Sequence, residues 1–255
     1  ARALETPGGL KIQTIHAFSE SLLHQFPFEA NVAASFTVLD DRDADALMQA
    51  ARADVIARAA RGNDKPLAAA FDRLLRRMAD MGLNDTLDAV LRSRHALVRA
   101  FDAVSVAGFD ARLSHLLSLH AALLGLGESD PQIIRNMLAD PMRSSTHLPS
   151  DYIEMLQAAV PDPSATDIKN TNLMVTAHKG GTAEDRARAW SDLLYTGTGA
   201  PRGLSRFLPR IAKQVPDVLE RVAAEQQRGA NLIAHAHYAD LMHVALKVLD
   251  RFESL

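Results

Sequence analysis

Thr14 and His16 are the two side chains near the start of the chain whose chemistry suits contact with a phosphate. Residues 10–15 alternate apolar and polar side chains, which is typical of a short buried strand. A helix that Thr14 can cap is then predicted by large apolar residues at every fourth position, Phe18, Leu22 and Phe26. A strand that leads directly into a helix leaves unpaired N–H groups and the positive end of the helix dipole at the junction, where a phosphate can bind. On the residues alone we favour a simpler interpretation, in which Thr14 only caps the helix, His16 is a buried first-turn residue and Phe18 belongs to the core.

A second candidate is a basic segment, residues 201–213, which has a local charge of +4 and no acidic residue. Its basic side chains are Arg202, Arg206, Arg210 and Lys213. The four-residue spacing of the arginines predicts that they share one face of a short helix over residues 204–213, an arrangement that suits the phosphate backbone of duplex DNA. A solvated helix face is an equally good interpretation of this segment. It is the better one for two weaker clusters, Arg73, Arg76 and Arg77, and Arg92, Arg94 and Arg99.

Metal binding and nucleophilic catalysis are poorly supported. Near the C-terminus, only His237, Asp240 and His243 share a helix face, and His235 points to another side, so the set makes an incomplete metal site. We interpret these residues as polar surface, with His237 as a candidate core histidine. Ser19 has no base at a useful spacing, which argues against a Ser-His-Asp site.

The motifs of a nucleotide-driven motor are also missing from this sequence. No GxxxxGK[ST] loop occurs, and Gly180-Gly181 follow Lys179 rather than precede it. No Asp-Glu pair ends an apolar strand, and no acid-and-lysine nuclease cluster is visible. We therefore expect this polypeptide alone neither to bind nucleotide or metal cofactors, nor to hydrolyse ATP, nor to cut DNA.

The composition predicts a globular, helical protein. Of 255 residues, 47% are apolar, 23% charged and only 5% aromatic, and alanine and leucine are abundant. The net charge of −3 gives no global sign of nucleic-acid binding, so such binding must come from local clusters. The chain lacks cysteine, any apolar run near the roughly 20 residues that cross a bilayer, and a secretory signal. We expect a cytoplasmic protein without membrane contact, cut open within a helix that ends before Pro7.

Hydrophobic periodicity and turn residues predict an all-α fold, an irregular multi-helix bundle with one long C-terminal helix. The pattern is interrupted by a stop at Gly82 and by residues 166–181, whose Asn, Thr and paired Gly residues indicate a loop or a broken helix. Besides residues 204–213, the predicted helices cover approximately residues 41–60, 66–80, 84–104, 110–124, 131–140, 150–160, 184–194 and 216–252. On two of them we expect apolar faces that include Leu75, and Leu119 with Leu123. The last helix carries an apolar stripe, broken only by Gln226 and His237, and Gly229 is a possible kink. The apolar members of the stripe are Leu219, Val222, Ala230, Ile233, Leu241, Val244, Val248 and Phe252.

The first of these stretches also carries a family resemblance. Thr14-Ile15-His16-Ala17-Phe18, followed by Leu22-Leu23, resembles the T-x-H-x-F motif, called Ib, of superfamily-1 helicases of the UvrD/Rep group. The flanking residues 4–13 and 36–41, together with residues 193–202, 215–219 and 223–228, are similar to AddA-type subunits of bacterial double-strand-break repair helicase–nucleases. That family usually has Cys where this chain has Ser19, a small and weakly polar replacement.

The resemblance implies an excised piece of a larger DNA-processing enzyme. Residues 1–28 would be a remnant of a RecA-like motor domain, and residues 29–255 the helical subdomain 1B inserted into it. The parent would use ATP and Mg²⁺ to unwind and resect broken DNA with an AddB-type partner subunit. Thr14 and His16 would contact the single strand, which reverses the simpler interpretation given above, and the 1B arm would contact duplex. A strand without its sheet neighbours leads us to expect poor packing over the first roughly 20 residues and an intact helical body from Asp40 onward. The alternative is a free-standing helical protein-interaction or regulatory module.

Overall fold

The computed structural model describes residues 14–33, 35–78 and 80–255, with only the backbone of residues 80 and 81. Throughout these ranges the regular structure is helical, apart from one isolated antiparallel bridge between Tyr195 and Pro201. The predicted all-α fold with one long C-terminal helix is therefore confirmed.

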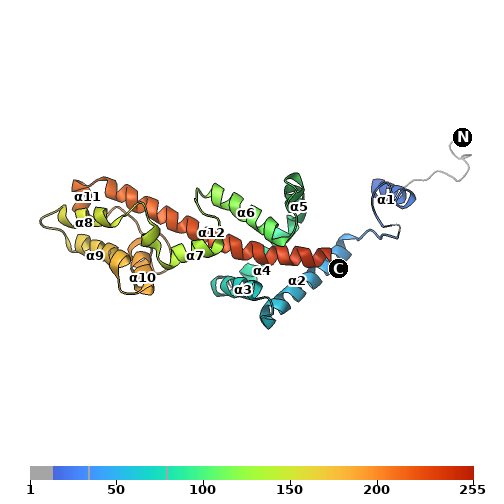
Figure 1. Cartoon of the computed structure of the whole chain (residues 1–255), viewed down its shortest axis with the longest axis horizontal. Helices are drawn as coiled ribbons and strands as arrows, with labels where there is room; N and C mark the ends of the chain where they lie inside the picture. Colours follow the sequence, from blue (N-terminus) through green and yellow to red (C-terminus); the bar gives the residue numbers. More distant parts are fainter. Residues whose placement is uncertain (1–13, 34, 79) are drawn as a thin grey trace, which may run out of the picture.

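The axis of the molecule is α12 (Asp217–Glu253), a helix of 37 residues. At 1.5 Å per residue it is roughly 55 Å long. Figure 1 shows the other helices of the body gathered around its two halves, with α7 (Pro131–Ala139) between the two groups. Ile134 of α7 packs on Leu232 and Ala236 at the middle of α12.

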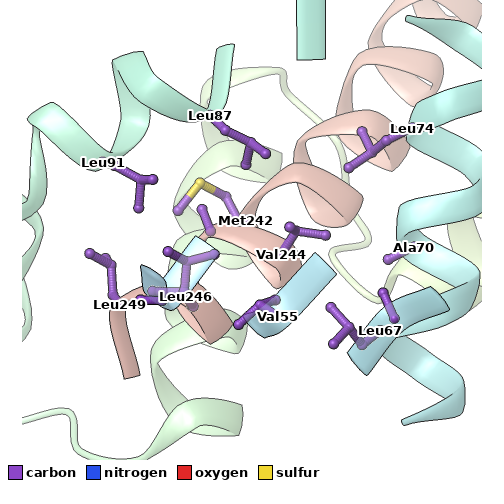
Figure 2. Packing of buried hydrophobic residues seen from close by; sticks show 14 of the residues in the cluster. Val55, Leu67, Ala70, Leu74, Leu87, Leu91, Met242, Val244, Leu246 and Leu249 are labelled. Carbon is purple, nitrogen blue, oxygen red and sulfur yellow. The ribbon is translucent and has the colours of Figure 1, made fainter. Parts of the chain in front are cut away.

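The C-terminal half of α12 packs against α2 (Asp41–Arg61), α3 (Lys65–Arg77), α4 (Asp80–Arg92), α5 (Arg94–Ala103) and α6 (Phe109–Leu123). Figure 2 shows Val55, Leu67, Leu87 and Met242 converging from four of these helices. Each leucine that is fully buried in this way contributes about 1.5–3 kcal/mol to folding.

The N-terminal half of α12 packs against the second group of helices, which ends with α11. Its elements are η2 (Pro141–Ser144), α8 (Ser150–Ala158), α9 (Ala165–Lys179), α10 (Ala183–Leu194) and α11 (Ile211–Gln214). Trp190, Leu193 and Leu194 of α10 are buried here together with Val218 and Val222 of α12. The two halves of α12 thus belong to two separate apolar cores on one continuous helix.

The first helix, α1 (Ile15–Gln25), lies apart from this body in Figure 1. None of its residues is buried: Ile15 is 71% exposed and Phe18 50%, so the prediction that Phe18 belongs to the core is wrong for this chain. Ile15 opens α1 rather than ending a strand, because the Thr14 side chain accepts the N–H of Ala17 and caps the helix there. The rest of the predicted strand, and the helix end predicted before Pro7, fall outside the described residues.

Two predicted interruptions were misplaced. Residues 165–179 form the continuous helix α9. A capping box of Ser164 and Asp167 fixes its start. Gly82 lies inside α4, and the break that the sequence analysis missed falls at Ser93, between α4 and α5.

Some predicted faces also differ from the observed ones. Leu75, Leu119 and Leu123 are exposed, Leu123 by 85%. Midway along α12 the buried line runs through Glu225, Gly229, Leu232, His235, Ala236 and Ala239 instead of through Ala230 and Ile233, and Gly229 does not interrupt the helix.

Candidate nucleic-acid interface

The basic segment is mostly irregular, and only residues 211–214 are helical. The prediction that Arg202, Arg206 and Arg210 share a helical face is therefore wrong. Phe207, Leu208 and Ile211 are buried in the core of the second group, and their burial leaves the basic side chains outside. The basic side chains are thus exposed because the apolar residues of the segment are anchored in the core. No regular helix aligns the basic side chains on one face.

Two side chains of α9 hold this segment in place. The amide of Asn170 donates a hydrogen bond to the carbonyl of Phe207. The carboxylate of Asp167 accepts the N–H groups of Arg210 and Ile211, each at 3.3 Å, in addition to its bonds from Ser164. Burial alone would raise the pKa of Asp167, but these hydrogen bonds outweigh burial and lower it. Asp167 therefore remains an anion that fixes the start of α11.

Arg202 is held on the side facing α10 and α12. Its Nε donates to the carbonyl of Asp192 at 2.9 Å, and its own carbonyl accepts the side-chain amide of Gln226 at 3.0 Å. The same amide donates to Leu194 at 2.8 Å, so one buried glutamine joins both ends of the turn after α10 to α12. The backbone and the Nε of Arg202 are therefore fixed, and its terminal guanidinium nitrogens remain able to bind a ligand.

Arg202 and Arg206 line a cavity of about 390 Å³, hereafter the basic hollow. Lys169 of α9 reaches the same cavity, which gives it three basic side chains against one acid, Asp192. Its remaining lining residues are Thr166, Asn170, Thr196, Gly203, Ser205 and Phe207. Guanidinium, ammonium, hydroxyl and amide groups are those that bind phosphate and sugar oxygens in protein–DNA complexes. The basic hollow thus has the side chains needed to contact the sugar–phosphate backbone of a nucleic acid.

The other two predicted residues lie outside the hollow. The guanidinium of Arg210 is bound to the carboxylate and the carbonyl of Asp162. Lys213 is exposed on α11, and its side chain makes no hydrogen bond or ion pair within the part of the chain that the structure describes. Lys169 was not among the predicted site residues because it lies in the stretch over residues 166–181, for which no helix was predicted. The Ser164–Asp167 capping box was the signal that could have placed Lys169 on a helix.

Thr14 caps α1 and His16 lies in it, and Figure 1 shows α1 at the opposite end of the molecule from α9 and α11. Both side chains are exposed, and the Thr14 hydroxyl accepts the N–H of Ala17 at 3.2 Å. The interpretation of Thr14 as a cap is confirmed, whereas His16 is not the buried residue predicted from the residues alone. Ser19 donates its hydroxyl hydrogen to the carbonyl of Ile15.

The weaker arginine clusters serve mainly internal contacts. Arg73 pairs with Asp240, and Arg76 with Asp72. Contacts within the chain also engage Arg92, which donates to the Asp88 carbonyl, and Arg94, which lies over the ring of Phe252.

The histidines of α12 are not the polar surface that the sequence predicted. His235 is completely buried, with its Nδ1 3.0 Å from Nδ1 of His120 and its Nε2 3.0 Å from the carbonyl of Ser129. Asp240 is bound by two arginines. Across the described ranges, no three His, Asp or Glu side chains are grouped to hold a metal ion.

Comparison with protein-family models, curated proteins and solved structures found no match to this chain. In the ranges that the structure describes, no helix is both long and apolar enough to cross a membrane. Any assignment of function therefore depends on the geometry of the chain itself and on the motifs it resembles.

Proposed function

We propose that this chain is a helical arm that binds the phosphate backbone of duplex DNA through the basic hollow. The observation that carries the proposal is the convergence of Lys169, Arg202 and Arg206 with hydroxyl and amide side chains around one cavity. The proposal needs a local site because the net charge of the chain is −3.

Binding in the hollow would be independent of base sequence. Arg202 lies in the turn after α10, where Gln226 and the carbonyl of Asp192 fix it, and the backbone of Lys169 is fixed in α9, so both cations start from defined positions before DNA arrives. Fixed cations lose little side-chain freedom on binding and make contacts with phosphate oxygens that carry no sequence information. A contact of this kind suits a protein that moves along DNA.

The larger context is proposed from the motif resemblance. In a helicase–nuclease subunit of the AddA type, Thr14 and His16 would contact the single strand while the arm holds duplex ahead of it. ATP, Mg²⁺ and an AddB-type partner would act on the parts of the parent enzyme that carry the motor and the nuclease. The exposed positions of Thr14 and His16 are compatible with this role.

The test is a salt series of DNA binding, measured by fluorescence anisotropy with duplex and forked DNA. Three phosphate contacts predict a slope of log K against log[salt] of about −2.7, from roughly −0.9 per contact. We expect Lys169→Gln with Arg206→Gln to flatten the slope by about 2. The matched control is Arg188→Gln, which removes an exposed cation of α10 paired with Glu184. An unchanged slope in the double variant, or an equal change in the control, would refute the basic hollow.

A protein-interaction module is the second candidate, and the exposed apolar side chains around α1 favour it. Phe28 is 89% exposed, and Ile15, Phe18, Leu22 and Phe26 are also exposed. Large apolar groups gathered on one short segment are typical of a surface that packs against another protein or domain. Lack of salt-dependent DNA binding by the wild-type chain would favour this candidate over the DNA arm.

A further inference from the structure

A second cavity, of about 250 Å³, opens between α3, α6, α7 and α12. Its walls include two arginines, Arg73 and Arg135, together with Gln132, Asp240, His243 and the apolar Leu113. Drug-sized ligands usually occupy about 300–1,000 Å³. The volume therefore favours a compact ligand.

The cations around this cavity outnumber the anions. Asp240 accepts the Nε and Nη2 groups of Arg73 at 2.9 and 2.7 Å, and the Nη2 group of Arg135 at 2.7 Å. The Asp240 side chain is only 4% exposed, and that of Arg135 25%. The Arg73 side chain is 39% exposed. Two partly exposed guanidinium groups thus share one nearly buried carboxylate, and one positive charge of this group of three remains uncompensated. An anion in the cavity would balance it.

Hydrogen-bonding capacity is also left over. The Nε of Arg135 and the Nε2 of His243 are buried and have no partner among the described residues. Both nitrogens have almost no exposed surface, so a ligand oxygen reaches them only if neighbouring side chains move. The Nη1 groups of Arg73 and Arg135 are different, because they make no hydrogen bond among the described residues and are not buried orphans. They are the donors that a ligand with acceptor oxygens would use.

The neighbouring charges do not supply the missing anion. Burial, together with the nearby Lys247, lowers the pKa of His243, so this histidine is neutral at pH 7. Three other acids lie near these groups. Asp64 pairs with Lys247 at 3.5 Å and caps α3, and Asp72 pairs with Arg76. Asp110 lies in the first turn of α6, where the helix dipole favours its charge.

We infer that this cavity binds a small tetrahedral oxyanion with the chemistry of a phosphate. The possible donors, Arg73, Arg135 and His243, come from three different helices, so a ligand with oxygens in several directions fits better than a planar carboxylate. Arginine presents a fixed fork of donors that matches phosphate oxygens. The source could be free phosphate or a phosphodiester of DNA, and the inference commits to the free ion. It is independent of the DNA contact proposed at the basic hollow.

The experiment is a titration of the wild-type chain with sodium phosphate at pH 7.5, with the ionic strength held constant by sodium chloride. Isothermal calorimetry gives the affinity, and the arginine Nε–H resonances in ¹H–¹⁵N spectra report the site. We expect saturable shifts of the Arg73 and Arg135 resonances and binding at least tenfold weaker in Arg135→Gln. The control is Arg76→Gln, which removes an exposed cation from α3 and should leave the affinity unchanged.

Arg135→Gln keeps the bidentate Arg73–Asp240 pair, and circular dichroism verifies its fold. If that variant does not fold, the wild-type resonances alone decide. Resonances that do not move with phosphate, or an unchanged affinity in a folded Arg135→Gln, would overturn the inference. It would also be overturned if a short duplex moved these resonances and free phosphate did not. Because Lys169→Gln with Arg206→Gln should leave phosphate binding intact, failure here is distinguishable from failure of the DNA proposal.

Discussion

The contact between Gly229 and Trp190 offers a sharp test of how α10 is fixed to α12. The indole N–H of Trp190 donates to Glu225 at 2.9 Å, and the same ring lies across Gly229, one turn further along α12. A Cβ atom at Gly229 would lie 2.5 Å from Cη2 of Trp190 and 2.6 Å from the hydroxyl of Tyr195. We predict that Gly229→Ala destabilises the protein.

The magnitude follows from opposing contributions. Alanine in a helix interior is favoured over glycine by about 1 kcal/mol. Against this, crowding a packed core costs about 1–3 kcal/mol. Displacing the Tyr195 hydroxyl from the carbonyl of Gln226, which it binds at 2.8 Å, costs about 1 kcal/mol more. The net loss of unfolding free energy is about 1–3 kcal/mol, and each kcal/mol lowers the melting temperature by about 2–4 °C in a protein of this size.

Thermal unfolding followed by circular dichroism measures the loss. The fluorescence of Trp190, the single tryptophan of the chain, reports the local displacement. Gly82→Ala in α4 is the matched control, because a Cβ atom there meets nothing within 4 Å. It should stabilise the protein by about 0.4–1 kcal/mol. A Gly229→Ala variant as stable as wild type, with unchanged fluorescence, would refute the reasoning.

Three further substitutions or conditions test the polar contacts. Asp240→Ala should lower the unfolding free energy by about 2–3 kcal/mol, less than for a fully buried pair because both guanidinium groups keep some solvent contact. Denaturant unfolding measures this loss. The control Asp72→Ala, which breaks a surface pair, should cost under about 1 kcal/mol. Asp167→Ala removes the N3 partner of the Ser164 capping box of α9 and the acceptor for the start of α11. We expect a loss of about 1–3 kcal/mol and faster amide hydrogen exchange at residues 210–211, and unchanged exchange would contradict that role. Acidification from pH 7.5 to 5.5 should lower the melting temperature. Burial lowers the pKa of His120, His237 and His243 below the 6.5 of the unfolded chain, so the unfolded state binds protons first as the pH falls. A melting temperature that does not change with pH would exclude this linkage.

Helix ends marked by a capping side chain were predictable from the sequence. The Thr14 cap and the start of α2 after Asp40 stand where local residue types placed them. These are interactions between residues three or four positions apart, so a short window of sequence contains all the partners.

Helix α9 was missed because its buried face is half polar. Its fully or nearly buried residues are Asp167, Thr171, Met174 and Ala177. Two of these are polar and only one is large and apolar, so no hydrophobic stripe is visible. The polar pair is stabilised by hydrogen bonds inside α9 and to residues 210–211, and the latter partners lie more than 40 residues away in the sequence. A pattern of apolar residues cannot reveal a helix whose burial depends on such contacts.

The candidate site was half predicted for the same reason. Arg202 and Arg206 could be proposed from their spacing, but the helix invoked to join them does not form. They meet because Asn170 and the buried Phe207 fold the irregular segment against α9. That fold also adds Lys169 and turns Arg210 toward Asp162. The path of the backbone therefore decides which cations come together. Counting charges along the sequence gives no information about that path.

The buried polar residues of α12 determine which helix sits where along it. Glu225 accepts the indole of Trp190, the guanidinium of Arg228 and the hydroxyl of Ser145, and Asp240 accepts arginines from α3 and α7. Apolar contacts alone would tolerate sliding of a neighbouring helix along a rod roughly 55 Å long, because one leucine can replace another. Sliding either group by one turn would leave a buried carboxylate unpaired, at a cost of several kcal/mol. We conclude that Glu225 and Asp240 fix the registers of the two groups, so the basic hollow and the cavity lined by Arg73 and Arg135 are held at a fixed separation.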